Sequence, residues 1–316
     1  DTLFQDNISI RAIVVDANKI WYAGTNSRFG YFDLASKKKI EHTIEKGDAK
    51  LEFRSMADNK KNVFVLNVGN PALLYRVDKT TLQPSVVYQE AHEKVFYDSL
   101  SFWNTKEGIA IGDPIDGVLS IIITRDGGKS WTKIPASSLP KVAAGEAAFA
   151  ASNTNIVTKG SDTWIFSGGV QSRVFYSPDK GKSWAVFTSP IIQGKAMTGI
   201  FTGAFYDSKN GFIAGGNYDV LGQNFGNKAR TVDGGKTWQL MAENKGFGYA
   251  SCVQYIPGSK GKGLVTVGAS GVFYSNDNGA TWEQLSKDSS LYTMRFLNKQ
   301  TAIAAGKNKM VRIRFK

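Results

Sequence analysis

The sequence contains very little of the side-chain chemistry on which many enzymes depend. Its 316 residues include one cysteine, Cys252, and two histidines, His42 and His92. A single cysteine excludes an internal disulfide, and two histidines are poor material for a metal site or a histidine-based catalytic triad. The chain also lacks a dinucleotide fingerprint and a phosphate-binding loop of the usual spacing. We therefore expect neither a cofactor nor a bound metal.

Long apolar runs are missing as well, and acidic residues are in the minority. No apolar run approaches the ~18 residues that a membrane helix requires, so we expect no membrane span. Thirty-nine basic residues against 27 acidic ones give a net charge of +12. Such a surface attracts acidic glycans or nucleic acid, but no motif that reads bases is present, and we do not expect nucleic acid. The chain begins at Asp1 without a methionine, which is compatible with a removed signal peptide and predicts an exported protein.

One eight-residue phrase occurs four times. The copies are Thr124–Trp131, Ser177–Trp184, Thr231–Trp238 and Ser275–Trp282. They recur about every 45–55 residues, a period typical of stacked supersecondary units. Each copy combines an Asp that accepts backbone hydrogen bonds, a Gly that tolerates positive φ and a Trp that can be buried beneath the turn. The phrase therefore predicts a repeated, tightly bonded turn.

This phrase, S/T-x-D-x-G-x-S/T-W, resembles the Asp-box (BNR repeat). The Asp-box is found in sialidases and in the family that includes the photosystem II stability and assembly factors. The resemblance implies a β-propeller in which each box lies between the third and fourth strands of a blade, on the rim. It also implies that Asp126, Asp179, Asp233 and Asp277 are structural and not catalytic.

A second repeat predicts the number of blades. Short β-rich runs that end in Gly recur seven times, from residues 20–24 to 302–306, and each lies between two further strand-like runs. The pattern predicts an all-β, seven-bladed propeller of four-stranded antiparallel blades, with residues 1–316 forming a single domain. The last unit is one strand short, so the N-terminal strand at Thr2–Gln5 is expected to complete it and close the ring. A six-bladed ring with one unit collapsed is the alternative.

The innermost strand of each blade lines the central channel of a propeller. These strands contribute the charged residues Arg11, Arg54, Asp98, Glu146 and Arg295. Charged residues within apolar strands need partners or a wet channel. Two interpretations stay open: the arginines bind an anionic ligand, or they neutralise the carboxylates and hold the blades together. Further candidates for ligand binding, mostly on or near the rim turns, are Arg28, Tyr97, Asp113, Arg173, Tyr218 and Tyr249.

The sequence favours a binding or assembly scaffold similar to the photosystem II stability factors. We expect a monomer whose partner is a protein or an anionic glycan at the channel mouth. The alternative is an exported, sialidase-like glycoside hydrolase in which Asp98 and Glu146 are catalytic and the arginines hold the substrate. Carboxylates about 5–10 Å apart in an open pocket would favour hydrolysis. Carboxylates sealed against arginines would favour the scaffold.

Overall fold

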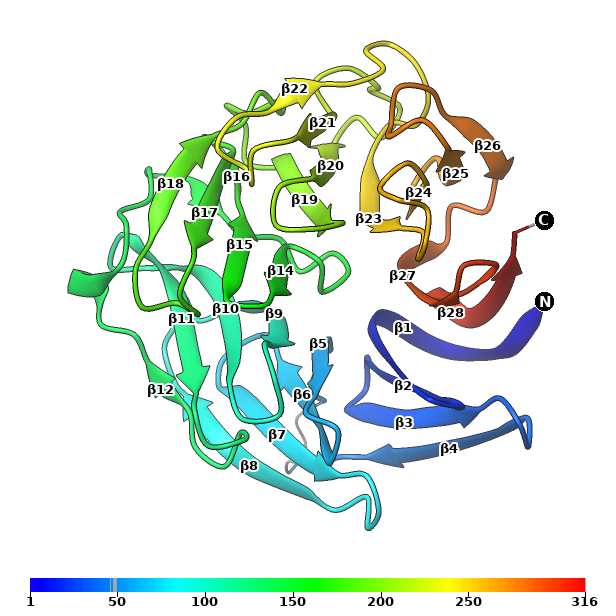
Figure 1. The fold of residues 1–316 in the computed structure, drawn as a ribbon. Coiled ribbons are helices and arrows are strands. Elements are labelled where there is room, and N and C mark those ends of the chain that lie inside the picture. The colour runs from blue at the N-terminus through cyan, green and yellow to red at the C-terminus, as the bar shows by residue number, and fades with distance from the viewer. Residues whose placement is uncertain (46, 48–49, 316) are drawn as a thin grey trace.

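The computed structural model describes residues 1–45, 47 and 50–315. Strands dominate this part of the chain, and the single short helix found in it is the 3-10 turn η1 (Ala136–Ser138). Figure 1 shows the sheets arranged radially around a common axis, with the two termini next to each other. The fold is an all-β propeller, as predicted. Within the described residues, no helix has the length and apolar character needed to cross a membrane.

Four sheets contain four strands each. One consists of β5 (Phe53–Asp58), β6 (Asn62–Asn67), β7 (Ala72–Asp78) and β8 (Pro84–Glu90). The next consists of β9 (Tyr97–Phe102), β10 (Gly108–Ile115), β11 (Val118–Thr124) and β12 (Thr132–Lys133). A third consists of β14 (Ile156–Lys159), β15 (Asp162–Phe166), β17 (Arg173–Ser177) and β18 (Ala185–Thr188). The fourth consists of β23 (Ala250–Tyr255), β24 (Leu264–Gly268), β25 (Gly271–Ser275) and β26 (Glu283–Ser286).

Two sheets contain six strands each. The first runs in the order β27 (Leu291–Asn298), β28 (Thr301–Arg314), β1 (Thr2–Asp16), β2 (Lys19–Gly24), β3 (Arg28–Asp33) and β4 (Lys38–Thr43). The second runs in the order β13 (Glu146–Ala147), β16 (Gly168–Gly169), β19 (Thr198–Phe205), β20 (Gly211–Asn217), β21 (Lys228–Thr231) and β22 (Gln239–Leu240). Consecutive strands pair antiparallel in both.

The number of sheets corrects the prediction of seven separate blades. The described residues form six hydrogen-bonded sheets, so the propeller has six blades and not seven when each sheet is counted as one blade. The first and last predicted units are joined because β1 and β28, of 15 and 14 residues, run without interruption through the ring closure. A six-bladed ring was the alternative prediction, with one repeat unit collapsed. In the residues that the structure describes, the number six arises because two units join into one sheet, and no unit has collapsed.

The closure itself is formed as predicted. β1 pairs with β28 from Thr2 opposite Val311 to Ser9 opposite Lys307, and the later half of β1 pairs with β2. The terminal amino group of Asp1 also donates to the carbonyl of Arg312 over 2.9 Å. Backbone hydrogen bonds between the two ends of the chain therefore hold the ring shut, and a free strand edge at the closure is avoided.

The four Asp-boxes lie on the rim turns that the resemblance implies, each between the last two strands of its sheet. In the first box, Asp126 accepts from the N–H groups of Lys129 and Ser130 over 2.9 and 3.1 Å, and the same pattern recurs in the others. Gly128 has a φ of 78°, and a Cβ there would lie 2.3 Å from the ring of Phe64 in the preceding sheet. Each box thus seals its turn onto the neighbouring sheet.

Candidate functional site

The innermost strands share a β-bulge near their beginnings. The extra residues are Arg11 in β1, Arg54 in β5, Asp98 in β9, Phe201 in β19, Ser251 in β23 and Tyr292 in β27. A bulge redirects the side chain of its extra residue and bends the strand. These residues mark one end of the channel, which we call the proximal mouth; the distal mouth is the end at which the innermost strands finish.

The fourth predicted innermost strand is not regular. It is split into β13 and β14, and residues 148–155 between them leave the sheet. We call residues 148–155 the plug, because nearly all of them are buried and because they bond to the innermost strands around the channel. In Figure 1 a loop beside β14 reaches into the centre of the ring. The expectation of a regular strand at 146–151 is therefore wrong beyond Ala147.

Hydrogen bonds attach the plug to strands on every side. Asn153 donates to the carbonyls of Met56 and Leu100 over 2.9 and 3.2 Å, and it accepts from the N–H of Leu100 over 2.8 Å. On the other side, the Thr293 hydroxyl donates to the carbonyl of Ser152 over 3.1 Å. A peptide segment fixed in this way satisfies its own buried polar groups and those of the strands. The plug therefore separates the proximal from the distal end of the channel.

Two of the predicted arginines lie at the proximal mouth. Arg11 donates to the carbonyl of Ala151 in the plug over 3.2 Å, and its guanidinium lies 4.4 Å from the ring centroid of Tyr292. Arg54 donates to Glu52 over 2.7 Å and lies 5.8 Å from the ring centroid of Phe96. Both side chains are partly exposed. Aromatic faces orient both guanidiniums, as in a cation–π contact, and the charge of Arg54 is paired with that of Glu52.

An aromatic cluster continues this surface. Phe149 stacks on Phe201 with ring centroids 3.9 Å apart, and Tyr249 meets both Phe201 and Tyr218 edge to face. Tyr249 is buried, whereas Tyr218 is 44% exposed. Burial raises the pKa of Tyr249, and the nearby Arg11 opposes this only in part. The tyrosine ring beside Arg11 is therefore neutral and acts as packing surface at physiological pH.

The loop after β20 adds exposed apolar side chains to the proximal mouth. The large apolar residues that it exposes are Tyr218, Val220, Leu221 and Phe225. Its backbone is anchored by a 2.8 Å hydrogen bond from the N–H of Tyr249 to the carbonyl of Leu221. Contiguous exposed apolar side chains on a soluble protein are typical of a binding surface.

Asp98 lies beneath this surface and has no access to solvent. Its exposed fraction is 0%, and neither carboxyl oxygen has a hydrogen-bond partner within the described residues. Burial and the nearby carboxylate of Asp113 raise the pKa of Asp98 well above its usual range, and the positive charge of Arg54 opposes this only in part. The carboxyl group is thus held in its neutral form.

Glu146 is buried too, but all of its bonding capacity is used. Arg173 donates two hydrogen bonds to it, from Nε to Oε1 over 3.0 Å and from Nη2 to Oε2 over 2.5 Å. The hydroxyl of Ser167 donates to Oε1 over 2.6 Å, and the N–H of Ala143 donates to Oε2 over 2.9 Å. The bidentate arginine and the two further donors fix this buried carboxyl group in place.

The remaining predicted residues are dispersed. Arg28 forms ion pairs with Asp6 and Glu41 that join β3 to β1 and β4. Tyr97 is fully buried and donates to Glu90 over 2.8 Å, so that burial raises its pKa. These contacts place both side chains within the protein framework. Neither side chain is exposed to the channel by these contacts, so the structure does not support their predicted role in ligand binding.

Asp113 and Arg295 both contact the plug, but at different places. Asp113 accepts from the N–H of Ala148 over 3.0 Å, and burial raises its pKa to about 6. Arg295 lies further along its strand than the bulge residue Tyr292, on the distal side of the plug. The three arginines expected to line one channel site are therefore not brought together: Arg11 and Arg54 share the proximal mouth, and Arg295 lies at the distal mouth.

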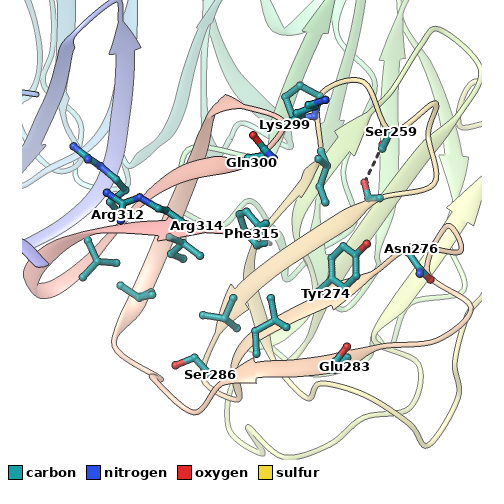
Figure 2. Close-up of a pocket in the computed structure, with 18 of the residues that line it drawn as sticks. Ser259, Tyr274, Asn276, Glu283, Ser286, Lys299, Gln300, Arg312, Arg314 and Phe315 are labelled. Carbon is teal, nitrogen blue, oxygen red and sulfur yellow. Dashed lines mark hydrogen bonds between the residues drawn. The ribbon is translucent and has the colours of Figure 1, made fainter. Parts of the chain in front are cut away.

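The largest cavity lies away from the channel. It measures about 1050 Å³ and separates β25 and β26 from β28. Figure 2 shows Tyr274 and Phe315 facing it, with Lys299 at one end and Glu283 at the other. Elsewhere the box tryptophans fill such gaps, as Trp282 does against Phe212 with ring centroids 5.7 Å apart. Within the described chain, β28 presents no box tryptophan here, and a packing gap explains the cavity.

Comparisons with known proteins support the fold. The BNR/Asp-box repeat family model matches residues 273–284, the fourth box. No curated protein matches the chain. A solved structure described as "YCF48 bound to D1 peptide" is 14% identical with a TM-score of 0.70, over 100% of this chain and 96% of that one. "Structure of U3-55K" is 13% identical with a TM-score of 0.68, over 100% of this chain and 98% of that one.

A glycoside hydrolase is among the similar structures as well. The GH74 xyloglucanase from Xanthomonas campestris is 12% identical with a TM-score of 0.70, over 99% of this chain and 53% of that one. At these identities the similarity shows the fold alone. The resemblance to Asp-box propellers is confirmed, whereas function depends on the channel residues of this chain.

Proposed function

We propose that this propeller is a non-enzymatic scaffold that binds an acidic, partly apolar peptide segment of a partner protein at its proximal mouth. The observation that carries the proposal is the plug, which closes the channel directly beneath Arg11 and leaves a shallow surface. Such a surface suits an extended chain, which makes many weak contacts along its length.

The chemistry of the mouth agrees with this ligand. Arg11 and Arg54 supply guanidiniums for carboxylates, and their stacking on Tyr292 and Phe96 limits their freedom before binding. The exposed loop after β20 supplies apolar contacts beside them. The similar structure described as YCF48 bound to D1 peptide is a propeller with a peptide ligand, which makes this class of ligand reasonable for the fold.

Hydrolysis of a glycan has less support. Asp98 is fully buried and Glu146 is sealed by Arg173, so neither carboxylate is placed to protonate a glycosidic oxygen or to attack a sugar. A carboxylate sealed against an arginine is the arrangement expected of a scaffold. Anionic glycans remain an alternative ligand for the same arginines.

The test measures peptide binding by fluorescence polarisation. The probe is a fluorescein-labelled decapeptide of alternating glutamate and leucine, with a lysine–leucine decapeptide and heparin fragments as comparisons. We expect the acidic peptide to bind best and the double variant R11Q/R54Q to weaken it at least tenfold, about 1.4 kcal/mol. Arg314→Gln, a change at an exposed arginine of the ring closure, is the matched control. Equal affinity in the double variant, or glycoside hydrolysis that is lost in Asp98→Asn, contradicts the proposal.

A further inference from the structure

The distal mouth contains a second, separate cavity. It measures about 550 Å³ and is surrounded by the ends of the innermost strands, including those of β1, β9, β19 and β27. Asn153 and Thr154 of the plug form its floor. In Figure 1 these strands converge on the axis of the ring. We call this cavity the distal cup.

Arg295 brings an uncompensated positive charge into the distal cup. Its Nη1 donates to the carbonyl of Met294 over 2.8 Å and to the hydroxyl of Thr293 over 3.2 Å, and it lies 3.8 Å from the Cys252 sulfur. Its Nη2 donates to the carbonyl of Asn153 over 3.4 Å. All of these partners are neutral. Within the described chain, no carboxylate lies within ion-pair distance of it.

The other charged residue of the cup does not neutralise this guanidinium. Asp58 at the rim is paired with Lys79 over 2.7 Å. A guanidinium stays protonated at any physiological pH, and a partly buried charge without a counter-ion is unfavourable. Burial accordingly lowers the pKa of Arg295. An anion that enters the cup would remove this penalty.

The walls of the cup restrict the kind of anion. Apolar and aromatic residues, among them Phe102, Ile156, Phe205, Tyr255 and Phe296, line the cup together with polar groups. The polar groups include the hydroxyls of Ser101 and Thr158, which lie 2.8 Å apart. An apolar body that carries one carboxylate would fit both the guanidinium and the walls.

We infer that the distal cup is a binding site for a small organic monocarboxylate with an aromatic or aliphatic body. The carboxylate pairs with Arg295, and the body packs against the ends of the innermost strands. The cavity volume, about 550 Å³, is ample for an arylalkanoic acid. This site is independent of the proposed peptide surface, because the plug separates the two mouths.

Isothermal titration calorimetry with hydrocinnamate tests the inference, with hydrocinnamamide as the neutral analogue. We expect one site per chain, a dissociation constant of about 1 mM or lower, and no measurable binding of the amide. Arg295→Gln should weaken binding at least tenfold. Arg314→Gln, at an exposed arginine of the ring closure, is the matched control and should leave it unchanged.

Arg295 also donates a hydrogen bond to the plug, so Arg295→Gln could lose binding because the plug is disturbed. A second variant that keeps Arg295 distinguishes this effect from the loss of the carboxylate partner. Ser101→Leu leaves the guanidinium in place and narrows the cup, and it should likewise weaken binding. Circular dichroism and the melting temperature establish that each variant is folded. Equal binding of acid and amide, undiminished binding in a folded Arg295→Gln, or no binding of hydrocinnamate, octanoate and indole-3-acetate to the wild-type protein would overturn the inference. None of these outcomes bears on the acidic peptide at the proximal mouth.

Discussion

Replacing Asp98 by Asn should remove a large pH dependence from the stability of the protein. The carboxyl group is completely buried, and within the described residues its oxygens accept no hydrogen bond. Burial and the neighbouring Asp113 raise its pKa, so the folded state keeps a proton that the unfolded state releases above its ordinary pKa of about 3.9. Stability is therefore greatest at low pH on this account and falls as the pH rises.

The magnitude follows from proton linkage. While Asp98 is protonated in the folded state and ionised in the unfolded state, the free energy of unfolding falls by about 1.4 kcal/mol for each pH unit. Asp113, with a pKa raised to about 6, contributes in the same direction up to that pH in both proteins. Asp98→Asn removes the first contribution and keeps the second. Above the unfolded-state pKa, and up to the pH at which Asp98 ionises in the folded protein, the two curves should diverge by about 1.4 kcal/mol for each pH unit.

Urea unfolding at a series of pH values across this window measures the effect. Asp116→Asn, on the exposed turn after β10, is the matched control and should follow the wild-type slope. Asp113→Asn should lower the pKa of Asp98 by removing its neighbouring charge, and so reduce the wild-type slope. Parallel curves for Asp98→Asn and the wild type would refute the assignment of a buried, neutral carboxyl group beneath the proximal mouth.

Three further predictions concern the framework around the two mouths. Arg173→Met leaves the buried Glu146 carboxylate without its partner and should destabilise the fold by about 3 kcal/mol, whereas the double variant with Glu146→Gln should recover much of this loss in thermal and urea unfolding. Asn153→Ala removes the hydrogen bonds of the Asn153 side chain and should lower the free energy of unfolding by about 3 kcal/mol. Because residue 153 has a φ of 60°, which glycine adopts without strain, Asn153→Gly should be about 1 kcal/mol less destabilising than Asn153→Ala. The opposite order of stabilities would contradict this account of the backbone. Asp126→Ala opens one Asp-box turn and should cost about 1 kcal/mol without changing the affinity of either mouth, so a loss of peptide binding without a loss of stability would show that the boxes are functional.

The repeat pattern was enough to predict an all-β propeller, the positions of the Asp-boxes and the pairing of the two termini. Such features depend on local turn chemistry and on strand edges that must be covered. The number of sheets was predicted wrongly, because β1 and β28 pass through the ring closure without a break and the sequence carries no mark of that continuity. Gly168 and Gly199 join β16 to β19 in the same unforeseen way.

The candidate site was predicted only in outline. Arg11, Arg54 and Asp98 do occupy equivalent bulges at one channel mouth. Arg295 was grouped with them because a bulge is not visible in a strand-like sequence, and a shift along the strand placed it at the other mouth. The plug was taken for a strand, although its run of small and short polar residues lacks the regular alternation of a β-strand and was the one available signal.

The sequence by itself determined the repeat and its turns, since these follow from spacing and from residue type. Only the tertiary structure decided which charges meet. Arg173 closed on Glu146, Asp98 was left without a partner, and Arg295 was turned toward a cup of its own. The reason is geometric: eight residues of plug cross the channel, and whether a charge is paired, neutral or open to a ligand depends on the side of that segment on which it lies.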